Sequence, residues 1–125
     1  MNFEKFAERI IGGELAKQEL ERQLSDYFFG EDADDLFKIG DPYIMDIYCD
    51  TYDNSIEINL QNIDNPREFC LKKITKEFSK NLLQSGCSHF WINFYAKDKL
   101  KIAEYYVTDD IIWEFKLIKN ECSEN

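Results

Sequence analysis

The sequence predicts a single α+β domain spanning residues 1–125, built on a mostly antiparallel five-stranded sheet with its helices packed on one face. Apolar residues recur at helical spacing in two separate stretches, and they alternate with polar residues in five others. Along the chain these stretches give the order α-β-β-α-β-β-β, which a sheet covered on one face satisfies most simply. The length of 125 residues is typical of one domain, and no internal repeat is apparent.

The first predicted helix covers residues 2–29. Apolar residues fall along it at three- and four-residue steps, and Lys17 interrupts this stripe. Gly12 and Gly13 each cost about 1 kcal/mol relative to alanine inside a helix. We therefore expect one helix that bends near Gly12, or two short helices that meet there. The stripe consists of Phe6, Ile10, Gly13, Leu20, Leu24 and Tyr27.

A loop and a β-hairpin are predicted next. Residues 30–42 are rich in acidic residues and glycine, which indicates an acidic loop. The two stretches that follow alternate in polarity on either side of a turn at residues 51–54. The pattern predicts that one face of the hairpin is buried and the other points outward. The buried positions are predicted to be Met45, Ile47, Cys49, Ile56, Ile58 and Leu60, and the outward positions Asp46, Tyr48, Asp50, Glu57, Asn59 and Gln61.

The second predicted helix has clear signals at both ends. Asn65 suits the N-cap, Pro66 the first helical position, and Glu68 stands three residues after the cap. Gly86 is placed to end the helix. The predicted apolar stripe consists of Leu71, Ile74, Phe78 and Leu82.

Three strands are predicted after this helix. Residues 89–95 alternate, residues 96–99 turn into a strand at 100–107, and residues 108–110 turn into a strand at 112–118. The tail at 120–125 is expected to fray. In the first of these strands, the predicted buried residues are Phe90, Ile92 and Phe94, and the outward residues are His89, Trp91, Asn93 and Tyr95.

The composition indicates a folded protein, with 44% hydrophobic and 15% aromatic residues. No apolar run approaches the ~18 residues that cross a bilayer, and the first residues lack the apolar core of a secretory signal. We therefore expect a cytoplasmic protein. In that reducing compartment the cysteines are expected to be free thiols, namely Cys49, Cys70, Cys87 and Cys122.

Charge is distributed unevenly around a net value of −10. Residues 30–68 carry eleven acids and two bases, whereas residues 69–101 carry two acids and seven bases. The acidity argues against binding to nucleic acid or to an anionic membrane, because both require a basic surface. It favours a basic protein partner, or it marks a solvated face.

The basic segment has a simpler interpretation. Its lysines fall opposite the apolar stripe of the second helix, and Glu77 can pair with one of them. The pattern is typical of a solvated helix face, and the alternative is contact with an acidic neighbour. The lysines are Lys72, Lys73, Lys76 and Lys80.

Metal binding is not predicted. A calcium loop that begins at Asp32 would need glycine at its sixth position and glutamate at its twelfth, and it has neither. Asp46 and Asp50 are separated by four strand residues, ~13 Å, so they cannot share one ion. His89 is the only histidine, whereas structural zinc usually takes four ligands. We expect neither a metal nor another cofactor.

Two patterns could support catalysis. Cys87 and His89 stand one residue apart, but nothing in the sequence orients the imidazole toward the thiol. Asp110, Glu114 and Lys116 give an acid followed by Glu-x-Lys, which is a weak match to a metal-dependent nuclease. Phosphate-binding glycine loops and serine-nucleophile elbows are absent. The sequence therefore favours a binding protein over an enzyme.

Aromatic residues on the outward face suggest what the protein binds with. Tyrosine and tryptophan are enriched at the energetic centres of interfaces, often beside charged residues. The alternative is that these aromatic residues pack on loops or cover a second small core. The predicted partner-binding residues are Asp46, Tyr48, Asp50, Asp53, Glu57, Trp91 and Tyr95.

The preferred hypothesis is a bacterial immunity protein or antitoxin that occludes the active site of a basic toxin, most simply a nuclease. Nuclease toxins need basic surfaces, and an acidic inhibitor complements them and associates faster. The first alternative is a phage-type mimic of nucleic acid that blocks a DNA-binding host protein. The second is the weak metal-dependent nuclease that would use Asp110, Glu114 and Lys116.

Overall fold

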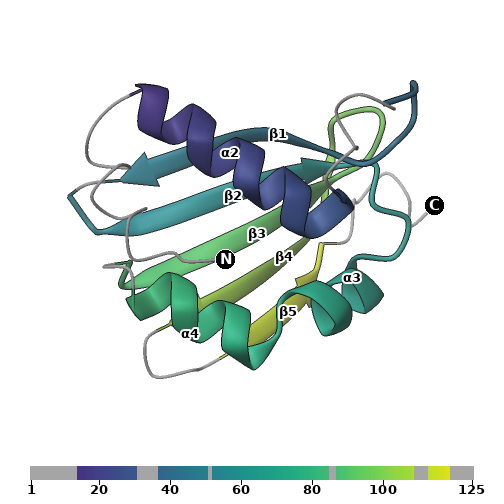
Figure 1. Ribbon diagram of the computed structural model, residues 1–125. Helices are drawn as coiled ribbons and strands as arrows, with labels where there is room; N and C mark the ends of the chain where they lie inside the picture. The colour runs from purple at the N-terminus through teal and green to yellow at the C-terminus, as the bar shows by residue number, and fades with distance from the viewer. Residues whose placement is uncertain (1–13, 31–36, 51, 85–86, 109–112, 119–125) are drawn as a thin grey trace.

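The computed structural model describes residues 14–30, 37–50, 52–84, 87–108 and 113–118 (Figure 1). These residues follow the predicted order, except that the second helical stretch is divided in two. The helices are α2 (Glu14–Phe29), α3 (Pro66–Lys73) and α4 (Lys76–Gln84). The strands are β1 (Tyr43–Asp50), β2 (Ser55–Gln61), β3 (His89–Tyr95), β4 (Lys101–Thr108) and β5 (Trp113–Leu117).

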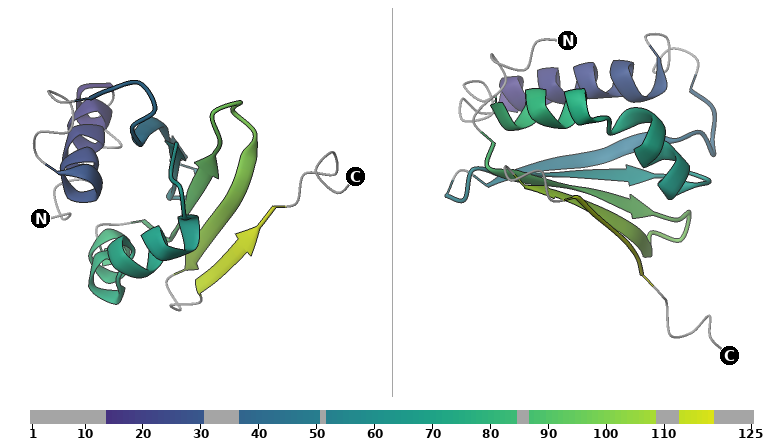
Figure 2. Two further views of the ribbon diagram at one scale, coloured as in Figure 1. Left: turned by 90° about the vertical axis from the view of Figure 1, so that its right-hand side faces the viewer. Right: turned by 90° about the horizontal axis from the view of Figure 1, so that it is seen from below.

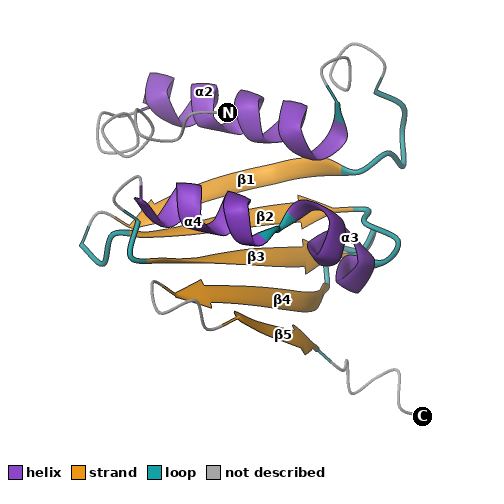
Figure 3. Cartoon of the chain, turned by 60° about the horizontal axis from the view of Figure 1, so that its bottom comes forward, coloured by secondary structure: helices purple, strands orange, loops and turns teal. Residues whose placement is uncertain are grey.

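The strands lie side by side in sequence order, from β1 to β5, in one sheet (Figure 3). All neighbouring pairs are antiparallel except β2 and β3, which are parallel. A parallel pair requires a long crossover, and α3 and α4 supply it. The prediction of a mostly antiparallel five-stranded sheet is confirmed.

All three helices lie on one side of the sheet, as predicted (Figure 2). Aromatic rings join them to each other and to the central strand. The ring of Phe69 on α3 lies 5.3 Å from that of Phe28 on α2 and 5.8 Å from that of Phe94 on β3. On α4, the ring of Phe78 lies 5.7 Å from Phe28 and 6.3 Å from Phe90. Helices α3 and α4 therefore pack on β3 and on α2 through aromatic rings, and α2 also contacts β1.

The apolar core residues of the central strands follow the predicted alternation, but Gln61 and Asn93, which were predicted to be outward, are buried as well. Leu20 and Leu24 of α2 are fully buried, as expected for its apolar stripe. The fully or nearly fully buried strand residues include Ile47, Ile56, Ile58, Leu60, Phe90, Ile92, Phe94 and Val107.

The first strand departs from the predicted alternation at Met45. The pairing register between β1 and β2 shifts between Ile44 and Asp46, which marks a β-bulge. A bulge adds one residue to a strand and resets which side chains point inward. Ile44 is consequently buried and Met45 only half-buried, so the prediction that Met45 faces the core was wrong.

The second predicted helix begins as expected but is interrupted in the middle. The side chain of Asn65 accepts a hydrogen bond from the backbone N–H of Glu68 at 3.1 Å, which confirms the N-cap. Ile74 ends α3 with φ −94° and ψ 64°. The hydroxyl of Thr75 then accepts from the backbone N–H of Phe78 at 3.1 Å and caps α4.

The interruption also changes which residues of α3 are buried. Cys70 and Ile74 face the core, whereas Leu71 is 77% exposed. The predicted stripe was therefore wrong at Leu71 and right at Phe78 and Leu82. Since Cys70 and Ile74 are four residues apart, they share one side of the helical turn, and Leu71 is rotated away from it.

Some predictions fall outside the described residues. These are the bend near Gly12, most of the acidic loop, the helix end at Gly86, and the tail at 120–125.

Candidate functional site

The side of the sheet opposite the helices carries no helix in the described part of the chain (Figure 2). We call the side chains on this side the open face. The cross-strand register aligns them in rows across the sheet. The open face consists of Asp46 and Tyr48 on β1, Glu57 and Asn59 on β2, His89, Trp91, Asn93 and Tyr95 on β3, Glu104 and Tyr106 on β4, and Glu114 and Lys116 on β5.

One row places a carboxylate between aromatic side chains. Tyr48, Glu57, Trp91 and Tyr106 are aligned across four neighbouring strands. The rings of Trp91 and Tyr106 are stacked, with centroids 4.9 Å apart and an interplanar angle of 27°. Tyr48, at the other side of Glu57, is 57% exposed. Glu57 is therefore flanked by aromatic residues on both neighbouring strands.

The next row is a chain of polar side chains. Asn59 donates from Nδ2 to Oδ1 of Asp46 at 2.6 Å, and Asn93 donates from Nδ2 to Oδ1 of Asn59 at 2.9 Å. Asn93 is only 3% exposed, and its Oδ1 has no hydrogen-bond partner among the described residues. Asn93 was not among the predicted partner-binding residues. The available signal was one amide in an otherwise apolar and aromatic strand.

Tyr95 lies close enough to three carboxylates for their charge to affect its ionisation. Burial raises the pKa of Tyr95 above its ordinary value, and the carboxylates of Glu57, Asp46 and Glu104 raise it further because they oppose a second negative charge. Glu104 also lies 3.5 Å from the ammonium of Lys101. Within the described ranges, no ion pair involves Asp46 or Glu57.

Comparisons with family models, with curated proteins and with solved structures find no match. The residues of the open face are therefore the basis for assigning a function.

Of the predicted partner-binding residues, Asp46, Tyr48, Glu57, Trp91 and Tyr95 are brought together on the open face. Of the other two, Asp50 is the last residue of β1 and Asp53 lies in the turn that follows. The Oδ1 atom of Asp50 accepts from the backbone N–H groups of Tyr52 and Asp53, at 2.9 and 3.3 Å, so this carboxylate holds the turn. Asp53 is exposed, and its carbonyl oxygen accepts from the hydroxyl of Ser88 at 2.9 Å.

The geometry of Cys87 and His89 disfavours nucleophilic chemistry. Cys87 is buried, and burial raises the pKa of its thiol to about 12. Its Sγ donates to the carbonyl oxygen of His89 at 3.0 Å, whereas the imidazole Nδ1 lies 2.8 Å from the hydroxyl of Ser88. The thiol thus stays protonated at neutral pH and is not hydrogen-bonded to the imidazole. Cys49, Cys70 and Cys87 are free, as predicted, and Cys122 lies outside the described residues.

The nuclease pattern is only partly described. Glu114 and Lys116 are exposed on one face of β5, where they align with Tyr106 and Glu104. Asp110 lies outside the described residues. Within those residues, no group of three His, Cys, Asp or Glu side chains is arranged to hold a metal ion. None of the described helices is long and apolar enough to cross a membrane.

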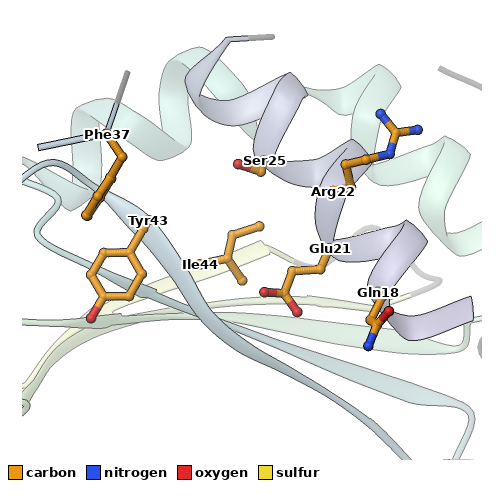
Figure 4. A pocket seen from close by; sticks show the side chains of 7 residues that line it. All are labelled: Gln18, Glu21, Arg22, Ser25, Phe37, Tyr43 and Ile44. Carbon is orange, nitrogen blue, oxygen red and sulfur yellow. The ribbon is translucent and has the colours of Figure 1, made fainter. Parts of the chain in front are cut away.

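Among the clefts in the described part of the chain, two lie beside the helices, away from the open face. One, of about 460 Å³, separates α2 from β1 (Figure 4). Its cation, Arg22, is already bound to Glu19 at 2.6 Å and to Asp26 at 3.2 Å. The other, of about 580 Å³, lies where α3 and α4 meet β4 and β5, and the Arg67 guanidinium there lies 4.7 Å from the centroid of the Phe115 ring. In both clefts the arginine already contacts a neighbouring side chain.

Proposed function

We propose that the protein is an inhibitor that binds a basic protein toxin, in the manner of bacterial immunity proteins and antitoxins, and covers its active site. The observation that supports this is the open face. It presents Asp46 and Glu57 among aromatic side chains, and neither carboxylate takes part in an ion pair within the described residues. A nuclease toxin is the most suitable partner, because it must display basic groups to hold nucleic acid.

Charge and aromatic side chains contribute to different stages of binding. A net charge of −10 speeds encounter with a basic protein by about 10- to 1000-fold at low salt. Once the two proteins touch, desolvated aromatic side chains contribute most of the affinity in typical interfaces. The open face has both, since Tyr48 and the stacked pair of Trp91 and Tyr106 flank the acids.

The dimensions of the sheet suit such an interface. Strands are spaced by about 4.8 Å and rise by about 3.3 Å per residue, so five strands of this length span roughly 20 by 20 Å. That area, about 400 Å², is about half of the ~800 Å² per partner of a typical stable interface. The toxin would therefore also touch the margins, including the exposed turn residues Tyr52 and Asp53.

The test is protection of growing cells against co-expressed basic nuclease toxins, with two matched charge reversals. One variant carries Asp46→Lys and Glu57→Lys on the open face. The control carries Asp64→Lys and Glu77→Lys, both at exposed positions outside that face. Each reversal adds two charges, so both variants change the net charge from −10 to −6.

We expect the open-face variant to lose protection and to associate at least about tenfold more slowly at low salt, with the difference shrinking at high salt. The control should protect like the wild type. Equal losses in both variants would show that only net charge matters and that the open face is not the binding surface. If the wild type does not protect but displaces duplex DNA from a DNA-binding host protein, the protein is a nucleic-acid mimic instead.

A further inference from the structure

We propose that the open face contains a receptor for one arginine side chain of the partner, formed by the carboxylate of Glu57, the amide oxygen of Asn93 and the ring of Trp91. This inference rests on the proposed function, because it specifies which group of the basic partner the open face accepts. Asp46 and Glu104 lie around the receptor and add negative potential.

Glu57 supplies the charge that an arginine would meet. It is half-buried, it is aligned directly with Tyr48 on one side and Trp91 on the other, and no ion pair of the described chain uses it. A guanidinium is planar, so its edge can bind a carboxylate while its face lies against an aromatic ring. A carboxylate between aromatic neighbours matches both properties.

The protein already uses each of these two contacts elsewhere. Arg22 binds Glu19 through two nitrogens, with Nη2–Oε1 and Nε–Oε2 distances of 2.6 and 3.2 Å. The guanidinium of Arg67 lies 4.7 Å from the centroid of the Phe115 ring. At Glu57 the carboxylate and the rings are present, and the arginine would come from the partner.

Asn93 provides an independent observation that points to the same ligand. The carboxylate of Asp46 can only accept hydrogen bonds, so it fixes Nδ2 of Asn59 as the donor toward it. Oδ1 of Asn59 must then accept, and it does so from Nδ2 of Asn93. The chain of side chains is thereby oriented, and it leaves Oδ1 of Asn93 as a buried acceptor without a donor.

Burial of this oxygen implies a small rearrangement on binding. Oδ1 of Asn93 is covered in the free protein, and the residues that flank it on the outward side of β3 are the half-buried Trp91 and Tyr95. One of these aromatic side chains turns aside as the ligand enters. The incoming donor then satisfies an acceptor that is costly to leave unpaired.

The spacing selects arginine over lysine. Glu57 and Asn93 are diagonal neighbours on the parallel strands β2 and β3, and the spacing of strands and residues places their Cα atoms about 8 Å apart. A guanidinium presents five donors in a fixed fork and can contact both groups, whereas an ammonium is a compact point charge. Lysine can pair with Glu57 but cannot bridge to the amide oxygen and lie flat on the ring.

The experiment is an NMR titration of the full chain with two peptides, acetyl-Gly-Arg-Gly-amide and acetyl-Gly-Lys-Gly-amide. We expect the arginine peptide to bind in the millimolar range, to shift the side-chain signals of Trp91 and Asn93, and to bind at least about threefold more tightly than the lysine peptide. Glu57→Gln, which keeps the shape of the side chain, should weaken binding about tenfold. The control Glu77→Gln should leave it unchanged.

The receptor is wrong if the two peptides bind equally, if Glu57→Gln and Glu77→Gln have the same effect, or if the shifts map to the cleft between α2 and β1. Its failure is separable from that of the proposed function. Arginine-selective binding together with no protection against a toxin would leave the receptor intact and overturn the function. Protection without arginine selectivity would support the function and overturn the receptor.

Discussion

Asn93 lies in the middle of the open face, and its replacement by leucine is expected to stabilise the protein. Leucine has the same branching as asparagine and fits a position that is 3% exposed. The change removes one hydrogen bond to Asn59, which destabilises the folded state by about 1 kcal/mol. It also removes a buried acceptor without a partner, which stabilises the folded state by about 1–3 kcal/mol. Added apolar burial contributes in the same direction. The free energy of unfolding should rise by about 1 kcal/mol, which corresponds to about 3–5 °C in Tm.

The assay is urea unfolding followed by circular dichroism, with the slope of the transition compared between variants. Asn59→Leu is the matched control. It loses two hydrogen bonds and relieves no unpaired acceptor, so it should destabilise by about 1–2 kcal/mol. A loss of more than about 1 kcal/mol in Asn93→Leu would show that Oδ1 of Asn93 is hydrogen-bonded in solution, and the inference of a vacant acceptor would then fail.

Three further predictions concern stability. Leu82→Ala should cost about 2–5 kcal/mol because Leu82 is fully buried, whereas Leu71→Ala should stay within about 0.5 kcal/mol; equal losses in chemical unfolding would contradict the division of the helix. Asn65→Ala should lower the free energy of unfolding by about 1 kcal/mol in the same assay, whereas Asn65→Asp should keep it at the wild-type value. Wild-type stability in Asn65→Ala would mean that the cap does not stabilise α3. Burial raises the pKa of Cys87 from 9.0, and that of Tyr105 from 10.0, to about 12 in each case. The unfolded chain therefore ionises first, and stability present below pH 9 should fall as the pH rises toward 12. Urea midpoints at pH 8 and pH 10.5 test this, and a smaller decline in Cys87→Ala should accompany it; identical midpoints would refute the assignment.

The sequence was sufficient for those parts of the fold that depend on local pattern. Alternation identified the apolar buried residues of β2 and β3, though not the buried amides of Gln61 and Asn93, and the Asn65-Pro66 signal marked the start of α3. It could not show that β2 and β3 are parallel, because strands in either orientation have the same alternation. The direction follows only once the intervening helices are known to cross the sheet.

The errors in the prediction arose where two adjacent apolar residues compete for one buried position. Ile44 and Met45 are both apolar, and only the bulge decides that Ile44 points inward. Cys70 and Leu71 pose the same problem, which the break after Lys73 resolves in favour of Cys70. Neither irregularity has a glycine or proline to mark it.

The sequence predicted which side chains share the open face, but not how those side chains are buried and hydrogen-bonded there. Alternation placed Asp46, Tyr48 and Glu57 outward, and it did the same for Trp91 and Tyr95. The burial of Asn93 could not be foreseen, because it depends on which strands lie on either side of β3. The role of Asp50 in the turn likewise depends on backbone geometry that sequence spacing does not reveal.

The single parallel pairing divides the sheet into two locally assembled halves, a hairpin of β1 and β2 and a meander of β3 to β5. Contacts within each half are short in sequence, whereas the seam joins Ser55 to His89 and closes a long loop, so it is expected to form late in folding. Glu57 belongs to the first half, and Trp91 and Asn93 to the second. A ligand that contacts all three residues connects β2 to β3, so only molecules in which these two strands have paired can bind it. Backbone amides along β2 and β3 should therefore exchange with solvent more slowly in the complex.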